Sequence, residues 1–321
     1  MNLTLLIVGF ILLIKGADYF IDGASNIAKY YNIPSVIVGL TLVAFGTSLP
    51  EAFVSVTASI NGQDSLALGN IVGSNIFNLL MIVGAAGVVE TLLVDNSILH
   101  KEFPLLLFSS ILMAIVSFDR NISRLEGLFL ISSFIVFTFY LIKNSIKSKN
   151  SNFYYYELYI PRNSSSFIKS KQDSISFSIV FSIIGMVLLI IGGKLVVNCS
   201  VSMANSFAIG NELIGFTIVA IGTSLPELVT ALVATTKGES GIALGSILGS
   251  NMFNILFITG LSSLASPMTV SSTILIDGLF MILITVLTYI FAFRKHDISK
   301  FESSALMILY TLYIFNLVSS I

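Results

Sequence analysis

The sequence predicts an all-α polytopic membrane protein of ten transmembrane helices, arranged as two inverted five-helix repeats with broken helices at the centre. Three observations lead to this prediction: an apolar composition, an internal duplication, and a hexapeptide that occurs twice inside apolar sequence. The chain of 321 residues is 55% hydrophobic and only 10% charged, with a mean hydropathy of +0.96. This composition is typical of a chain that crosses the membrane many times.

The composition also excludes several classes of protein. A net charge of −1 and a pI near 6.1 leave no broad basic surface for nucleic acid. The single cysteine, Cys199, excludes an internal disulfide framework and a cysteine-based metal site. The two histidines, His100 and His296, lie near predicted helix ends, which argues against a histidine proton relay or transition-metal site. We expect no cofactor.

Ten apolar runs are candidates for membrane spans. They lie at about 2–22, 35–59, 66–89, 103–118, 125–142, 176–198, 211–236, 242–265, 273–293 and 303–320. The first run lacks a basic leader and a small-residue cleavage site, so we interpret it as a span and not as a signal peptide.

One long polar stretch, 143–174, separates the fifth run from the sixth and is rich in Ser, Asn, Lys and Tyr. It is typical of a linker. We therefore divide the chain into a first transmembrane repeat at 1–143, a cytoplasmic linker at 144–174 and a second, inverted repeat at 175–321.

An internal duplication relates the two halves. A shift of 176 positions aligns them without gaps and takes Ile14 to Ile190 and Asn78 to Asn254. Ten of thirteen positions from 39–51 and nine of thirteen from 66–78 match their partners. Because each half holds five runs, an odd number, the second half is expected to be inserted upside down. Inverted repeats with interrupted helices are typical of secondary transporters.

The basic residues predict the orientation. With both termini extracellular, thirteen of the sixteen Lys and Arg residues face the cytoplasm and only Arg120, Arg124 and Lys194 face outward. This bias predicts a multi-pass protein of the cell (plasma) membrane with a cytoplasmic linker. We interpret the basic residues of the linker as a topology signal and not as a lipid-recognition site.

The hexapeptide Gly-Thr-Ser-Leu-Pro-Glu occurs at 46–51 and again at 222–227. Pro50 lacks an N–H and clashes with the carbonyl four residues earlier, so it should break the helix and free backbone carbonyls. Ser48 and Glu51 fit a capping box that would begin the second half-helix. The positive end of that half-helix favours an ionised carboxylate.

Acidic residues inside a membrane are costly, by about 2.5 kcal/mol or more, and therefore indicate function. Of the seventeen acidic residues, we expect only Glu51 and Glu227 to lie well inside spans.

A second duplicated block follows each hexapeptide, at 69–78 and 245–254. Its glycine pairs, spaced four apart, are expected to let helices approach closely. Its serine and asparagine, also four apart, share one helix face. The candidate ion site thus consists of five residues from each half: Thr47, Ser48, Glu51, Ser74 and Asn78, with Thr223, Ser224, Glu227, Ser250 and Asn254.

These side chains offer only oxygen and amide groups, which suit hard cations such as Ca²⁺ and Na⁺. Two carboxylates would balance the charge of one Ca²⁺. With help from neutral oxygens, they would also hold two or three Na⁺. A single site that accepts either load is what ion exchange requires.

At these two motifs the chain resembles the cation/Ca²⁺ exchanger superfamily, and within it the prokaryotic Na⁺/Ca²⁺ exchangers. The resemblance implies ten helices and a transporter, not an enzyme, that extrudes Ca²⁺ by admitting Na⁺. It implies that Glu51 and Glu227 bind both ions and that the carbonyls of Thr47 and Thr223 help to hold Ca²⁺. It further implies Na⁺ sites lined by Ser48, Ser74, Ser224, Ser250 and the carbonyls of Ala44 and Ala220, with Asn78 near the middle.

Asn254 departs from the pattern, because some prokaryotic relatives and the K⁺-dependent branch resemble one another in having aspartate there. The amide removes a third carboxylate, so K⁺ cotransport is not expected.

Three other functions stay open at this point. A Ca²⁺/H⁺ exchanger of the same superfamily is the main alternative, although neither block contains histidine. An intramembrane enzyme with paired carboxylates is less favoured, since we expect no aspartate in the core spans. A channel is disfavoured by the broken inverted repeats. Besides the lipid bilayer and the two ions, no partner is predicted, and a monomer is one open possibility.

Overall fold

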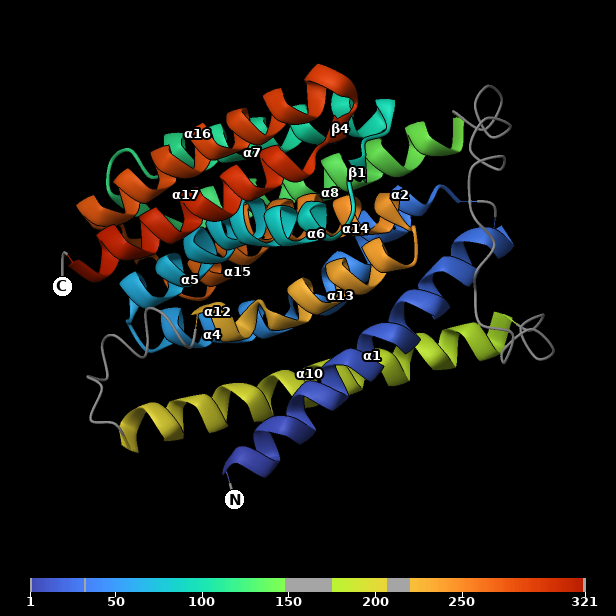
Figure 1. Ribbon diagram of the computed structural model, residues 1–321. Coiled ribbons are helices and arrows are strands. Elements are labelled where there is room, and N and C mark those ends of the chain that lie inside the picture. Colours follow the sequence, from blue (N-terminus) through green and yellow to red (C-terminus); the bar gives the residue numbers. More distant parts are fainter. Residues whose placement is uncertain (1, 32, 148–174, 207–219, 320–321) are drawn as a thin grey trace.

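The computed structural model describes residues 2–31, 33–147, 175–206 and 220–319, and within them the chain is a bundle of helices with four very short strands (Figure 1). The predicted all-helical architecture is therefore confirmed for the described residues. Most of the predicted linker, 148–174, lies outside them.

The first half contains thirteen helical and strand segments, three of which are π-helical (η). It begins with α1 (Asn2–Tyr31), α2 (Ser35–Val38), η1 (Gly39–Val43), α3 (Ala44–Thr47) and α4 (Leu49–Ile60). It continues with α5 (Asp64–Phe77), η2 (Asn78–Ile82), α6 (Val83–Val89), β1 (Leu92–Leu93), η3 (Ile98–Glu102), α7 (Phe103–Val116), β2 (Asn121–Ile122) and α8 (Arg124–Lys147). Helix α8 thus includes residues 144–147 of the predicted linker.

The second half repeats this order. It contains α10 (Ile175–Ser206), α12 (Ala220–Thr223), α13 (Leu225–Thr236), α14 (Ser240–Met252), η6 (Phe253–Ile258), α15 (Thr259–Ala265), β3 (Met268–Thr269), α16 (Ser272–Lys295), β4 (Asp297–Ile298) and α17 (Lys300–Ser319). Part of the predicted span at 211–236 lies outside the described residues, which resume at Ala220.

Seven of the described helices are long and apolar enough to cross a membrane. An eighth candidate is the pair Ser35–Thr47 and Leu49–Ile60, whose two parts meet at an angle of 49°. A multi-pass membrane protein is thus supported by helix length and composition. The count of ten stays a prediction, because Leu225–Thr236 is a shorter apolar helix.

The duplication extends well beyond the residues that the sequence alone aligned. Ser123 and Glu126 form a capping box in which Glu126 Oε2 accepts from the Ser123 backbone N–H at 2.8 Å. Ser299 and Glu302, 176 positions later, form the same box, with a distance of 3.0 Å. Each box begins the last helix of its half, α8 or α17.

Backbone conformation repeats at the same interval. Gly62 and Gly238 have φ of 70° and 73°, and Arg120 and His296 have φ of 65° and 57°. All four residues adopt the left-handed backbone conformation in the turns that follow helices, at corresponding positions of the two halves. The two halves therefore share their turns as well as their helices.

Two short antiparallel ribbons join the halves. Strand β1 pairs with β4 in the register Leu92↔Ile298, and β2 pairs with β3 in the register Asn121↔Thr269. Within the first half, β1 precedes α7 and β2 follows it, so the two ribbons lie at opposite ends of that helix.

Close helix packing depends on glycine at two places. Helices α1 and α10 lie side by side along one edge of the bundle (Figure 1), where a Cβ added to Gly16 would come within 2.8 Å of the Leu189 backbone N. A Cβ on Gly245 or Gly249 would come within 2.5 Å of Val36 O or 2.6 Å of Leu40 O. The predicted role of the second glycine pair is confirmed.

The glycine pair of the first half makes no such close contact with the described residues. No described atom lies within 4 Å of a Cβ added to Gly69 or Gly73.

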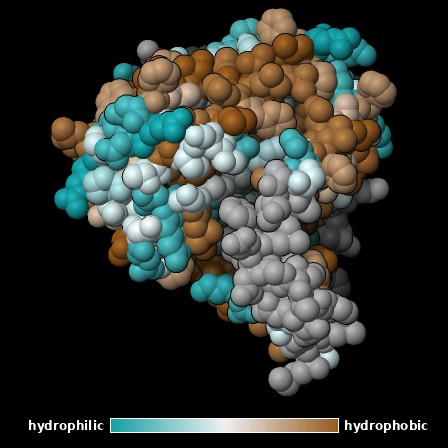
Figure 2. All heavy atoms as spheres, turned by 90° about the vertical axis from the view of Figure 1, so that its left-hand side faces the viewer, coloured by the Kyte–Doolittle hydropathy of each residue, from teal (hydrophilic) through white to brown (hydrophobic). Residues whose placement is uncertain are grey.

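An ionic cluster joins α1 to the turn between α13 and α14. Lys237 Nζ lies 3.3 Å from an Asp18 carboxylate oxygen and 2.9 Å from one of Asp22. Glu239 Oε1 accepts from Ser25 Oγ at 2.6 Å and lies 3.5 Å from Lys29 Nζ. Elsewhere the long helices expose apolar side chains, and Figure 2 shows hydrophilic residues gathered on the end of the bundle beside brown hydrophobic surface.

Candidate ion-binding site

Each hexapeptide breaks its helix at the serine, as predicted. Helix α3 ends at Thr47 and α4 begins at Leu49, while Ser48 between them has φ −84° and ψ 7°. Ser224 has nearly the same conformation, with φ −89° and ψ 8°, before α13. In both copies proline is in the first turn of the new helix, where its missing N–H costs nothing.

The predicted capping box at this break is wrong. Neither Ser48 nor Ser224 makes a side-chain cap to its own helix. Ser48 Oγ instead donates to Glu227 Oε1 at 2.9 Å, and Ser224 Oγ donates to Glu51 Oε1 at 2.9 Å. Each serine hydroxyl thus donates to the glutamate of the other half, and such a bond is strong when the carboxylate is ionised.

The two glutamates are buried and incompletely paired. Glu51 is 1% exposed and Glu227 is 3% exposed. The second carboxylate oxygen, Oε2, of each has no hydrogen-bond partner among the described residues. Neither glutamate forms an ion pair with a Lys or Arg of the described chain. Buried charge without a partner is costly, so this arrangement fits residues that bind cations.

Serines and carbonyls surround the glutamates. Ser224 Oγ also lies 3.1 Å from Ser74 Oγ, which brings the second block of the first half to the break in the second half. Ser250 Oγ donates to Ala44 O at 3.5 Å, which brings the second block of the second half to helix α3, before the break in the first half. Both serines are buried, at 1% and 0% exposed, so their oxygens face the interior of the bundle.

The threonines that precede the serines of the two helix breaks are hydrogen-bonded as well. Thr47 Oγ1 donates to Val43 O at 3.0 Å within its own helix. Thr223 Oγ1 donates to Asn70 Oδ1 at 3.3 Å, in the other half. Ala220 is the first described residue of α12, and only its place in the backbone is described.

The asparagines meet at the centre of the bundle. Asn78 Nδ2 donates to Asn251 Oδ1 at 2.9 Å. Asn254 is 1% exposed, and neither its Oδ1 nor its Nδ2 has a hydrogen-bond partner among the described residues. The structure thus brings glutamates, serines and asparagines of both halves into one buried polar region.

The sequence reasoning missed three residues of this region: Asn70, Asn75 and Asn251. Asn70 Nδ2 donates to Ser55 Oγ at 2.9 Å and to the Glu51 carbonyl at 3.4 Å. A signal was available for Asn75 and Asn251, because they are identical residues at matching positions of the duplicated block.

The expectation about acidic residues was also wrong. Asp277 lies inside the apolar helix Ser272–Lys295, and Glu102 lies inside the candidate span Ile98–Val116. Helix α1 carries Asp18 and Asp22 as well. The glutamate pair is distinguished instead by its contacts with the other half. The absence of aspartate therefore no longer argues against an enzyme.

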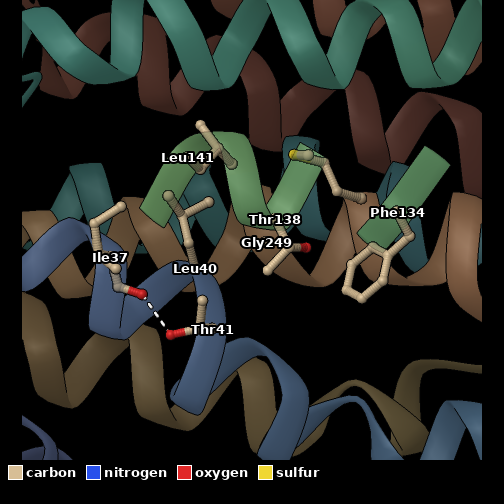
Figure 3. A pocket seen from close by; sticks show the side chains of 8 residues that line it. Ile37, Leu40, Thr41, Phe134, Thr138, Leu141 and Gly249 are labelled. Atoms are coloured by element: carbon tan, nitrogen blue, oxygen red, sulfur yellow. Dashed lines mark hydrogen bonds between the residues drawn. The ribbon is translucent and has the colours of Figure 1, made fainter. Parts of the chain in front are cut away.

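No group of three or more His, Cys, Asp or Glu residues gathers in the described chain. A hollow near the polar region is lined by Ile37, Leu40, Thr41, Phe134, Thr138, Leu141, Gly249 and Met252 (Figure 3). It is mostly apolar, and the Thr41 hydroxyl is already bonded to Ile37 O at 2.7 Å. The hollow does not include the glutamates, so the cation candidate is the buried polar region itself.

The fold and this region define a class of protein: a multi-pass helical membrane protein with a buried oxygen-rich site shared between two related halves. The chain belongs to the sodium/calcium exchanger protein family, whose model matches residues 1–143 and 177–318. The recognised family is therefore confirmed, and it is a family of transporters.

Individual relatives agree with this assignment. The sodium/calcium exchanger MaX1 of Methanosarcina acetivorans is 33% identical over 98% of this chain and 97% of its own. The putative antiporter CaxA of Alkalimonas amylolytica is 36% identical over 81% of this chain and 80% of its own. A solved structure of the sodium-calcium exchanger NCX_Mj is similar with a TM-score of 0.84 and 28% identity, covering 98% of both chains.

Proposed function

We propose that the protein is a secondary active antiporter that exchanges Na⁺ for Ca²⁺ by alternating access and normally extrudes Ca²⁺. The observation that carries this proposal is the reciprocal pair of bonds, Ser48 to Glu227 and Ser224 to Glu51, each 2.9 Å long. Because each half supplies a hydrogen-bond donor to the carboxylate of the other, the geometry of the ion site depends on the position of one half relative to the other. A change in that placement would change the site.

Charge supports exchange at one site. Two ionised glutamates supply −2, which one Ca²⁺ or two Na⁺ would neutralise. Among the described residues, the Oε2 atom of each glutamate and the amide oxygens of Asn78 and Asn254 have no hydrogen-bond partner, so they are available as ligands. A hard cation that loses its hydration water on binding needs oxygen ligands of this kind from the protein.

We assign the roles of the site residues on this basis. Glu51 and Glu227 bind both ions, and the carbonyls of Thr47 and Thr223 help to hold Ca²⁺. The Na⁺ ligands are the oxygens of Ser48, Ser74, Ser224, Ser250, Ala44 and Ala220, with Asn78 and Asn254 at the centre.

The ten-helix inverted repeat is part of the proposal. The shift of 176 takes β1 (Leu92–Leu93) to β3 (Met268–Thr269), yet β3 pairs with β2 at the other end of α7. Corresponding strands therefore lie at opposite ends of the bundle. This is what two halves inserted in opposite directions require.

We further propose the plasma membrane as the location, with both termini outside and the linker inside. The support is the bias of basic residues, thirteen of sixteen on the inner side. Lipid and the two ions are the only partners that the proposal needs.

Coupling to Na⁺ is favoured over coupling to H⁺. Neither duplicated block contains histidine, the side chain that most readily titrates near neutral pH. The serine hydroxyls around the glutamates are neutral oxygens suited to Na⁺. A Ca²⁺/H⁺ exchanger is the second candidate, since a buried carboxylate can also carry a proton.

Uptake of ⁴⁵Ca²⁺ into proteoliposomes separates these candidates. The vesicles are loaded with Na⁺ and diluted into Na⁺-free buffer at equal pH, and a second set carries a pH gradient without Na⁺. Uptake that requires the Na⁺ gradient supports the proposal. Uptake driven only by the pH gradient establishes H⁺ coupling, and uptake without any gradient indicates a channel. Empty liposomes serve as the control.

A further inference from the structure

Four buried asparagines, two from each half, lie on α5, α14 and the π-helical segments that follow them, and these elements pack against one another. They are Asn75, Asn78, Asn251 and Asn254. All four are at most 1% exposed. The shift of 176 exchanges Asn75 with Asn251 and Asn78 with Asn254, so the group has the symmetry of the repeat.

The hydrogen bonds in this group do not share that symmetry. Asn78 Nδ2 donates to Asn251 Oδ1 at 2.9 Å, and Asn251 Nδ2 donates to the Asn75 carbonyl at 3.5 Å. The corresponding bonds would run from Asn254 to Asn75 and from Asn75 to the Asn251 carbonyl. They are not formed, and both side-chain atoms of Asn75 and of Asn254 are unpartnered among the described residues.

Buried amides without partners are costly, and native proteins rarely keep them without a reason. Here the missing bonds are the mirror image of the bonds present. The same four side chains therefore have two equivalent networks available, of which this structure shows one.

We propose that Asn75 and Asn251 are positioning residues of the transport cycle, whose amides form one network when the site opens to one side and the mirror network when it opens to the other. This inference rests on the proposed exchange function, because inverted repeats exchange their conformations as access changes sides. Each amide acts through its neighbour, by orienting Asn78 or Asn254 at the centre of the ion site. Asn251 orients Asn78 in the arrangement seen here, and Asn75 would orient Asn254 in the other.

Alanine substitutions at Asn251 and Asn75 are expected to have opposite effects, so each variant is the matched control for the other. The Asn251 side chain takes part in both bonds of the present network, so Asn251→Ala should disfavour this arrangement. The Asn75 side chain has no partner here, so Asn75→Ala should disfavour only the mirror arrangement. The loss of about one hydrogen bond should shift the ratio of the two states about fivefold, in opposite directions.

The first measurement does not depend on transport. A cysteine replaces Thr230, which lies three residues after Glu227 and is 0% exposed, in a chain that carries Cys199→Ser. An impermeant thiol reagent is added from the outside or the inside of oriented vesicles, and the ratio of the two labelling rates is compared among variants. The double variant Asn75→Ala/Asn251→Ala should return near to the parent ratio.

The second measurement uses the transport assay. The half-saturating Ca²⁺ concentration is determined on each face, because apparent affinity scales with the fraction of carriers open to that face. The two alanine variants should shift the ratio of these values in opposite senses. Serine at the same positions provides a second pair if an alanine variant fails to fold.

Opposite shifts in either measurement support the proposal. Shifts in the same direction, or no shift in folded variants, overturn it. A wild-type protein without Na⁺-dependent Ca²⁺ flux would overturn the proposed function, which the labelling ratio does not measure. The two failures can therefore be distinguished.

Discussion

Ser48 donates its hydroxyl hydrogen to Glu227 Oε1 across the boundary between the two halves, at 2.9 Å. The matching bond from Ser224 reaches Glu51 Oε1 at the same distance. Neither half therefore completes the surroundings of its own glutamate.

Replacing either glutamate by glutamine, Glu51→Gln or Glu227→Gln, should abolish Na⁺-dependent Ca²⁺ flux. A single carboxylate leaves a desolvated divalent cation under-neutralised. The flux is measured as ⁴⁵Ca²⁺ uptake in proteoliposomes. Glu90→Gln, at an exposed position, is the control and should retain flux. Near-normal flux in either site variant would refute the site assignment.

Asn70 should matter more than its counterpart Ser246. Asn70 ties the Glu51 carbonyl, Ser55 and Thr223 together, whereas Ser246 Oγ only donates to Ala243 O at 2.9 Å. Asn70→Ser should weaken Ca²⁺ binding by about 1 kcal/mol or more, roughly five- to tenfold in the half-saturating concentration. Equilibrium ⁴⁵Ca²⁺ binding measures this. An unchanged affinity would show that these bonds do not position the site.

The orientation can be tested with two exposed positions related by the repeat, Ile60 and Thr236. In a Cys199→Ser background, Ile60→Cys should react with an impermeant thiol reagent added to intact cells, and Thr236→Cys should not. The reason is that the basic bias places the turn after α13 inside. After permeabilisation both should react. The reverse pattern would overturn the topology.

Asn254 should make exchange independent of K⁺. Asn254→Asp adds a third carboxylate at the centre of the site and should shift ion preference toward a higher total cation charge. Flux is measured with and without K⁺, and Asn78→Asp provides the symmetric comparison. A strict K⁺ requirement in the native protein would contradict this prediction.

Exchange should respond to voltage. The glutamates supply −2, so a Ca²⁺-loaded site is neutral, while three Na⁺ held with the help of serine and carbonyl oxygens leave +1. One charge is worth about 2.3 kcal/mol per 100 mV, more than a tenfold change in the Ca²⁺ ratio at equilibrium. A valinomycin-clamped potential, interior negative, should favour Ca²⁺ exit from vesicles whose cytoplasmic face is inside. Indifference to voltage would indicate electroneutral exchange.

Much of the fold and of the site could be predicted because the sequence motifs of the first half recur in the second half. The break at Ser48, the helices that flank it and the polar region around Glu51 all follow from residues that recur 176 positions later. The family resemblance rested on the same residues. The site assignments themselves stay predictions.

Two of the failures concern contacts between the halves, which no local sequence pattern reveals. Ser48 and Glu51 satisfy the local pattern of a capping box, but the Ser48 hydroxyl donates to the Glu227 carboxylate in the other half. Asn70 shows no local pattern at all, since its partner Thr223 is far along the chain. Asp277 does not belong to the duplicated pattern, because its counterpart at position 101 is a lysine.

The two β-ribbons have a consequence for biogenesis. The partner of β1 (Leu92–Leu93) is β4 (Asp297–Ile298), close to the end of the chain. During translation, β1 is therefore synthesised long before β4. The helices of the first half enter the bilayer while the backbone of β1 is still unpaired. Maturation of the whole bundle is thus a late event that depends on the last helix pair, α16 and α17. For the same reason, truncation near the C-terminus should destabilise the first half around β1 and α6, which contact β4 and α17, without removing any residue of the proposed ion site.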